Sequence, residues 1–315
     1  MTTARSAWAH AGVVAGIVAG LVIAAVALAW VLAAPLLSPW AAAVRAVADG
    51  AAVCCLGLAA VPLLEEQRYR GELLQRASGP LVAAAAVWLV TELVRLAMSA
   101  AELVDVSVAQ LSLRTAWDFA TVTAAGRSAL FSLTAALLIC LSALMIQATL
   151  AVRLAVAGIA ATGITARAVT GHLSEGTLSA TAVVVHALAA AVWCGVLAAL
   201  ALTVHKRGQW ARVLPPFSRL SLICVVTLLI GGTVSALSRL DTPGDLYATG
   251  YGRVLLAKIA ATLVLLALAW RNRTTWVPVA SAHRISADGS RVKALTELTV
   301  MAVALTLAAA LTVTG

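Results

Sequence analysis

Runs of about twenty apolar residues, separated by short polar or proline-containing segments, form the pattern of this chain from end to end. A helix of that length crosses a hydrocarbon core roughly 30 Å thick. Lipid cannot satisfy backbone N–H and C=O groups, so such runs must be helical. The pattern predicts an all-α, polytopic membrane helix bundle with about nine spans, near residues 11–34, 41–64, 80–101, 128–148, 150–170, 177–203, 217–238, 254–270 and 295–313.

Several features mark the ends of these spans. The first run, 11–34, is longer than the apolar part of a signal peptide and precedes a poor cleavage site, so we expect a retained helix. Breaks are expected at Pro215-Pro216 and across the polar segment 271–293. The segment 102–127 mixes apolar and charged residues and predicts an amphipathic helix on the outer membrane face.

Composition and charge support a membrane protein. The chain is 62% hydrophobic and 11% charged, whereas soluble domains have roughly 25% charged residues. The net charge of +9 does not indicate nucleic-acid binding, because no compact basic domain is present and Lys and Arg collect in cytoplasmic loops. With the N-terminus inside, inner segments hold thirteen Lys and Arg and outer segments four. This asymmetry predicts N-terminus in and C-terminus out.

A weak internal repeat is present. Residues 44–48 resemble 185–189, and 125–127 resemble 251–253, with each pair running in the same direction across the membrane. Two parallel four-helix halves plus a ninth helix would explain this, and chance similarity between Ala-rich helices is the alternative. The corresponding division is an N-terminal half, 1–150, with spans one to four and a C-terminal half, 151–315, with spans five to nine.

Charged residues inside spans are candidates for function, because burying a charge in a membrane is costly. Arg45 and Asp49 lie one turn apart near the outer end of the second span, and Glu92 and Arg95 lie in the outer half of the third. These residues can pair along their own helix or between helices. The pattern favours an ion-pair lock between the two spans, with a direct role in ion movement as the alternative.

Histidine and tryptophan add a candidate outer vestibule. Trp193 follows His186 by seven residues and lies on nearly the same face of the sixth span, while Trp88 precedes Glu92 by one turn. These side chains could face one cavity in the outer half.

Metal ligands would come from the same region. Imidazole nitrogen with carboxylate or thioether suits a transition metal. The candidate ligands are His172 and Glu175 in the loop before the sixth span, His186, and the Met98 thioether. The alternative is a helical His186 satisfied by a neighbouring hydroxyl or carbonyl.

Other chemistry is poorly represented. The five cysteines all lie in apolar runs and are expected to pack as small hydrophobes without disulfides. A Walker loop, a phosphorylated-Asp motif and CxxC are missing from the sequence, which argues against an ATP-driven pump. We expect a protein that is not an enzyme. A haem-bearing membrane reductase needs facing histidines on different helices, which the distribution of the five histidines disfavours.

The C-terminal half resembles the copper-resistance D (CopD) family of bacterial membrane proteins, and residues 1–150 match that family in hydropathy and layout only. The motifs that carry the resemblance are Gly171-His172, the run 186–195, Phe217-Ser218-Arg219-Leu220, the run 251–258, Ala269-Trp270-Arg271-Asn272-Arg273 and Glu297.

The resemblance implies a protein of the bacterial cytoplasmic membrane in copper homeostasis, which moves copper inward and receives it from a small CopC-type extracytoplasmic copper-binding protein. By position, His172 and His186 match histidines of the family, and Trp193 matches its tryptophan. Copper import, with a copper ion as the bound species, is our leading hypothesis. The second is a non-transporting scaffold for a copper chaperone or cytochrome oxidase assembly factor, and the third is the haem-bearing reductase.

Overall fold

The computed structural model of this chain describes residues 20, 23–33, 38–169, 177–237 and 244–314. These residues form helices and contain no β-strand. Eight of the described helices are long and apolar enough to cross a membrane, at Pro39–Leu64, Arg70–Leu103, Ala124–Met145, Leu150–Ala168, Ala180–Thr203, Arg207–Val234, Gly250–Ser281 and Ala287–Thr312. The predicted all-α polytopic membrane bundle is therefore confirmed.

These eight helices correspond to the second to ninth predicted spans. The first predicted span, 11–34, contributes the shorter apolar helix Ile23–Ala33. The rest of that span, apart from Gly20, lies outside the described residues.

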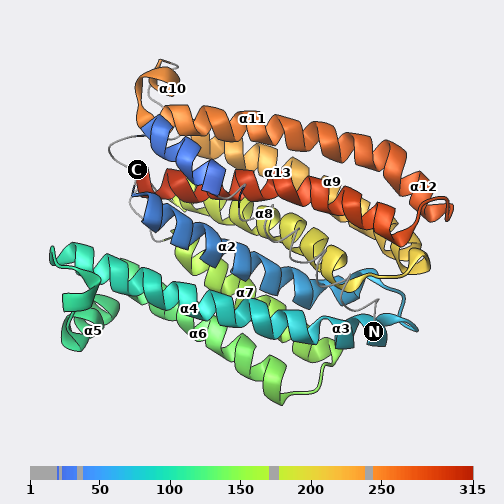
Figure 1. Ribbon diagram of the computed structural model, residues 1–315, viewed down its shortest axis with the longest axis horizontal. Coiled ribbons are helices and arrows are strands. Elements are labelled where there is room, and N and C mark those ends of the chain that lie inside the picture. Colours follow the sequence, from blue (N-terminus) through green and yellow to red (C-terminus); the bar gives the residue numbers. More distant parts are fainter. Residues whose placement is uncertain (1–19, 21–22, 34–37, 170–176, 238–243, 315) are drawn as a thin grey trace.

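The elements follow one another with short connections. They are α2 (Pro39–Ala60), η1 (Val61–Leu64), α3 (Arg70–Arg76), α4 (Ser78–Leu103), η2 (Val108–Gln110), α5 (Leu113–Val122), α6 (Ala124–Met145), α7 (Leu150–Val169), α8 (Thr177–Thr203), α9 (Arg207–Leu237), α10 (Asp245–Ala248), α11 (Gly250–Arg271), η3 (Asn272–Trp276), α12 (Val277–Ser281) and α13 (Ala287–Thr314). The long helices lie side by side along the length of the bundle (Figure 1). One end carries α5 and α10 and is called the α5 end here, and the other carries α3 and α12 and is called the α3 end.

The helices α2 and α8 form the centre of the bundle. α2 packs against α4, α7, α8 and α13. Where α2 crosses α8, a Cβ atom on Gly57 would lie 1.8 Å from the Gly195 carbonyl oxygen, and one on Gly195 would lie 2.2 Å from the Val53 carbonyl oxygen. Only glycine allows two backbones to approach this closely. The five cysteines are free and lie buried or half-buried within the spans, as predicted.

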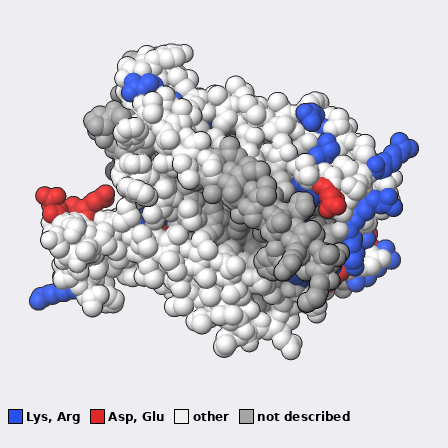
Figure 2. Space-filling view, viewed as in Figure 1, with Lys and Arg blue, Asp and Glu red and all other residues white. Residues whose placement is uncertain are grey.

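The outer surface of the bundle is apolar between its two ends. Large side chains such as Phe131, Ile223 and Leu263 are more than 60% exposed, as expected where lipid tails rather than water cover the protein. Figure 2 shows few charges between the ends on this face, while Lys and Arg gather at the α3 end. This distribution is that of a multi-pass membrane protein.

Polar side chains at the α3 end join the α2–α4 connection to the α8–α9 connection. Arg212 donates two hydrogen bonds to the Glu65 carboxylate, at 2.7 and 3.0 Å. Its guanidinium also lies 4.0 Å from the centre of the Tyr69 ring. Glu72 of α3 accepts a hydrogen bond from Lys206 at 2.9 Å. These contacts fix the connections that follow the ends of α2 and α8.

The predicted break at Pro215-Pro216 is wrong, and the break predicted across 271–293 is present but shorter than expected. Pro215 and Pro216 lie inside α9, which is continuous from Arg207 to Leu237, although proline removes a helical hydrogen bond. The adjacent Leu214 and Phe217 are buried in the core, so packing against neighbouring helices outweighs the lost hydrogen bonds. Within 271–293, η3, α12 and the first turns of α13 are helical, and the break between the last two spans is confined to residues 282–286.

The helices α6 and α11 begin in the same way. Thr123 and Thr249 cap them, each side chain accepting a hydrogen bond at 2.9 Å from the amide of the glycine three residues later. Arg127 and Arg253 then turn back and donate to the carbonyls five and six residues earlier. The two similar motifs therefore have the same local structure. The wider duplication of four-helix halves stays a prediction.

The segment 102–127 forms a helix over part of its length, α5. Leu113, Trp117 and Val122 on α5 are 91%, 64% and 71% exposed. Asp105, with a φ of 54°, separates α4 from the turns that lead to α5. The predicted amphipathic helix is thus shorter than the segment, and its contact with a membrane surface stays a prediction.

Candidate functional site

Five charged side chains from three helices meet inside the bundle, in the half nearer the α5 end. They are Arg45 and Asp49 of α2, Glu92 and Arg95 of α4, and Arg167 of α7. We call this group the Arg167 cluster.

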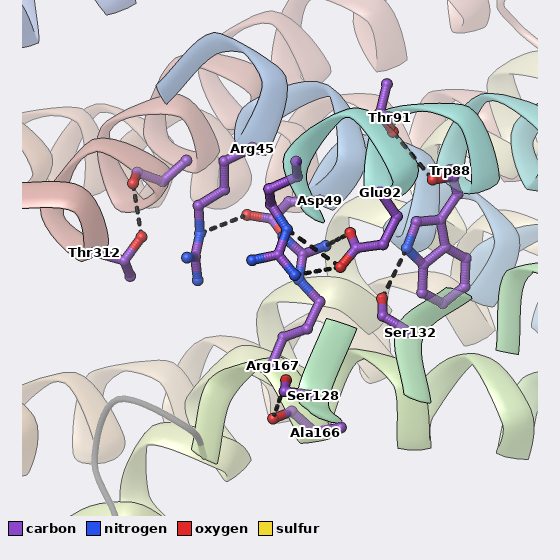
Figure 3. Close-up of polar contacts among 12 residues, drawn as sticks. Arg45, Asp49, Trp88, Thr91, Glu92, Ser128, Ser132, Ala166, Arg167 and Thr312 are labelled. Carbon is purple, nitrogen blue, oxygen red and sulfur yellow. Dashed lines mark hydrogen bonds and ion pairs between the residues drawn. The ribbon is translucent and has the colours of Figure 1, made fainter. Parts of the chain in front are cut away.

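Arg167 is the centre of the cluster, reaching between carboxylates of two other helices (Figure 3). Its Nη2 lies 3.0 Å from Asp49 Oδ1 and its Nη1 lies 3.2 Å from Glu92 Oε2. Glu92, which is fully buried, also pairs with Arg95 one turn along α4. The Arg45 Nε lies 3.7 Å from Asp49 Oδ2. One guanidinium therefore links α2, α4 and α7.

The charge of the cluster bears on its role. Three guanidiniums face two carboxylates, which leaves an excess positive charge when all five groups are ionised. A passing copper cation would be repelled by this excess. The geometry therefore favours the ion-pair lock over ion conduction through the cluster.

Trp88 lies one turn from Glu92 in the interface of α4, α6 and α7. Its side chain is fully buried, and its indole nitrogen donates a hydrogen bond to the Ser132 hydroxyl of α6 at 3.2 Å. A Cβ atom on Gly163 of α7 would lie 2.8 Å from the indole ring. Trp88 thus packs between these helices beside the Arg167 cluster.

His186 of α8 faces a different interface, that with α9. Its Nδ1 lies 3.1 Å from the Leu228 carbonyl oxygen. A carbonyl oxygen only accepts, so Nδ1 carries the proton, and in the neutral ring Nε2 keeps its lone pair. A Cβ atom on Gly232 would lie 3.2 Å from His186 Cε1, so the ring rests against α9 backbone. The backbone therefore orients the imidazole, and His186 has the carbonyl partner that the alternative interpretation expected. Binding of a metal by this ring would use Nε2.

Two family models match consecutive parts of the chain. The model for the copper resistance protein D-like N-terminal domain matches residues 36–180, and that for copper resistance protein D matches residues 211–312. The chain belongs to the copper resistance protein D family. Comparison with curated proteins and with solved structures gives no match.

Membership of the copper resistance protein D family makes this chain a multi-pass membrane protein of copper resistance and homeostasis. The resemblance stated for the C-terminal half is confirmed. The family match also extends over most of the N-terminal half, including α2 and α4 with four members of the Arg167 cluster.

The other candidate residues have separate positions in this family member. His172 and Glu175 lie outside the described residues. Met98 is on α4, which packs on α2, α5 and α6, whereas His186 faces α9. Trp193 is 4% exposed and lies near Glu297 of α13. In the part of the chain that the structure describes, no three His, Cys, Asp or Glu side chains form a metal site, so the shared vestibule and its copper ligands stay predictions.

Two charged residues are more deeply placed than the sequence pattern indicates. Arg167 lies near the end of its predicted span but reaches inward to Asp49 and Glu92. Glu297 lies ten residues into α13, because that helix begins at Ala287 rather than near 295. An ionisable residue within a long helix was the available signal in both cases.

Proposed function

We propose that this copper resistance protein D family member moves copper across the bacterial plasma membrane toward the cytoplasm. Its N-terminus would be inside and its C-terminus outside, as the thirteen inner and four outer Lys and Arg indicate. A CopC-type extracytoplasmic protein is the expected donor of copper. The gathering of Lys and Arg at the α3 end supports this end as the cytoplasmic one.

The orientation of His186 is the observation that carries the proposal. A histidine that ligates a metal usually donates its other ring N–H to a carbonyl or carboxylate, and the Nδ1 contact of His186 with the Leu228 carbonyl fits that arrangement. His186 lies about nine residues from the start of α8 at the α5 end, so copper arriving from that side would meet it early. His172 and Glu175 remain the candidate partners of His186.

Copper uptake into sealed vesicles tests this proposal. His186→Asn keeps a side-chain N–H near the position of Nδ1 but removes the Nε2 lone pair. We expect uptake of radiolabelled copper to fall by about tenfold or more, with unchanged protein level and thermal melting. His205→Asn, at the exposed α3 end, is the matched control and should transport as the unaltered chain does. Equal uptake by His186→Asn and the unaltered chain would reject His186 as a ligand.

The alternative function is a scaffold that docks a copper chaperone or an oxidase-assembly factor without moving copper. The observation in its favour is α5, whose Leu113 and Trp117 are largely exposed. The same vesicles distinguish the two functions, because a scaffold gives no copper uptake. For a scaffold, replacing Leu113 and Trp117 by Ser should abolish partner binding. The His186→Asn protein should still bind the partner.

A further inference from the structure

A cavity of about 310 Å³ lies between α9, the end of α11 with η3 and α12, and α13, near the α3 end. Its walls are mostly apolar, with Phe217 from α9 and Leu266 from α11 among them. The polar side chains that line it are Glu297, Asn272, Arg273, Ser218 and Ser221. No residue of the Arg167 cluster lines this cavity, and neither does His186.

Glu297 is the distinctive group of the cavity. It is 2% exposed, and its Oε2 accepts a hydrogen bond at 2.7 Å from the side-chain amide of Asn272. Among the described residues, no Lys or Arg nitrogen lies within ion-pair distance of Glu297, whereas Glu92 and Glu65 each have an arginine. A buried carboxylate without a cation is costly, and the neutral acid is the form that an apolar wall tolerates.

The local fold explains why Arg273 does not neutralise this carboxyl. Pro278 lies at the start of α12, where it donates no backbone hydrogen bond and its ring crowds the carbonyl four residues earlier. The preceding residues, Asn272–Trp276, form a π-helical turn. Such turns frequently occur at functional sites. Arg273 instead donates to the Ser218 carbonyl and hydroxyl of α9, at 2.8 and 3.0 Å. The Arg273 guanidinium, which also lines the cavity, is thereby bound to α9.

The other described groups around Glu297 form no ion pair with it. From α8, the Cys194 thiol is within electrostatic reach, and the Trp193 indole N–H, which forms no aligned hydrogen bond, lies nearby. From α13 itself, Lys293 lies one turn away and forms no ion pair with Glu297. The walls from α9 and α11 add hydroxyl and apolar groups.

This donor set selects the ligand. Copper(I) prefers thiolate and thioether ligands. A hard metal cation needs about six oxygen ligands, whereas the polar lining offers one carboxyl, one amide and two hydroxyls. The Arg273 charge further disfavours a metal cation. A proton needs only the carboxyl oxygen.

We propose that Glu297 is a proton-binding site, loaded and unloaded through this cavity as copper crosses the protein. The carboxylate takes one proton from cavity water to become the carboxylic acid and returns it to water, so no other reactant is needed. The coupling rests on the proposed copper transport, whereas the proton site itself does not.

Infrared difference spectroscopy on the purified full chain tests the proton site without copper. Between about pH 5 and pH 9, the range over which buried carboxyls exchange protons, we expect a carboxylic-acid band that disappears reversibly. Glu297→Gln should lack that band, Glu65→Gln should keep it, and Glu297→Asp should retain a shifted one. Identical carboxyl bands in the unaltered chain and in Glu297→Gln would overturn the proposal.

Vesicles with a trapped pH indicator test the coupling. Proton movement that accompanies copper uptake should fall at least about tenfold in Glu297→Gln, while His186→Asn should lose both movements. Copper uptake without proton movement in the unaltered chain would refute the coupling. Absence of copper uptake in the unaltered chain would instead reject the proposed function and, with it, the coupling. The infrared measurement would still decide whether Glu297 binds a proton.

Discussion

Replacing Gly57 by Ala should separate the two central helices. The added Cβ would lie 1.8 Å from the Gly195 carbonyl oxygen and 1.9 Å from its carbon, and ordinary contact begins at 3.4 Å. The atoms in the way are backbone, so no side chain can turn aside. Either α2 moves away from α8 by the missing distance or the crossing is lost.

The expected cost follows from that displacement. Overpacking a well-packed core costs about 1–3 kcal/mol where side chains can adjust. Here the clash is with rigid backbone where α2 crosses α8, so we expect a loss of about 3 kcal/mol or more in the free energy of unfolding. Unfolding in mixed detergent micelles, followed by tryptophan fluorescence, measures this loss.

Gly50→Ala is the matched control, because Gly50 is on the same helix and has no atom within 4 Å of a built Cβ. It should be neutral or slightly stabilising, since alanine favours the helix. Gly57→Ala and Gly195→Ala act on the same crossing, so the double variant should lose less than the sum of the single losses. A Gly57→Ala protein as stable as Gly50→Ala would refute the backbone-contact argument.

Two further predictions concern the charged groups. In the Arg167 cluster, Glu92→Gln leaves three guanidiniums facing one carboxylate and should destabilise the protein by about 3–5 kcal/mol. Arg167→Met leaves two guanidiniums facing two carboxylates and should destabilise it less. Unfolding in detergent measures both losses, and a larger loss for Arg167→Met would contradict the charge argument. At the α3 end, Arg212→Lys loses one of two hydrogen bonds to Glu65 and the stacking on Tyr69. We therefore expect the free energy of unfolding to fall by about 1–2 kcal/mol in the same assay. An unchanged free energy of unfolding would show that the Arg212–Glu65 pair contributes little.

Hydropathy was sufficient to predict the spans, because lipid requires long apolar helices. It was a poor guide to their ends, since hydrogen bonding continues beyond the apolar core, as α13 shows by starting at Ala287. It also failed at Pro215-Pro216, where composition marks a break and the buried neighbours of α9 preserve the helix. At such positions, tertiary packing outweighs the helix-breaking preference of proline.

The candidate site was predictable where partners share one helix. The spacing of Arg45 with Asp49 and of Glu92 with Arg95 determines that each pair is within reach. The partner that joins them, Arg167, comes from another helix, and spacing along the chain carries no information about which helices are neighbours. Spacing likewise carries no information about the neighbours of the two tryptophans: Trp88 bonds Ser132 of α6, and Trp193 lies near Glu297 of α13.

The contact of Gly57 with Gly195 also restricts how the bundle can move. Helices that touch through their backbones cannot slide along each other without driving a carbonyl into the next turn, but they can tilt about the point of contact. Arg45 lies roughly three turns from that point toward the α5 end. A rearrangement that opens one end of the bundle is therefore expected to be a rocking motion about this pivot, which narrows the opposite end as it proceeds.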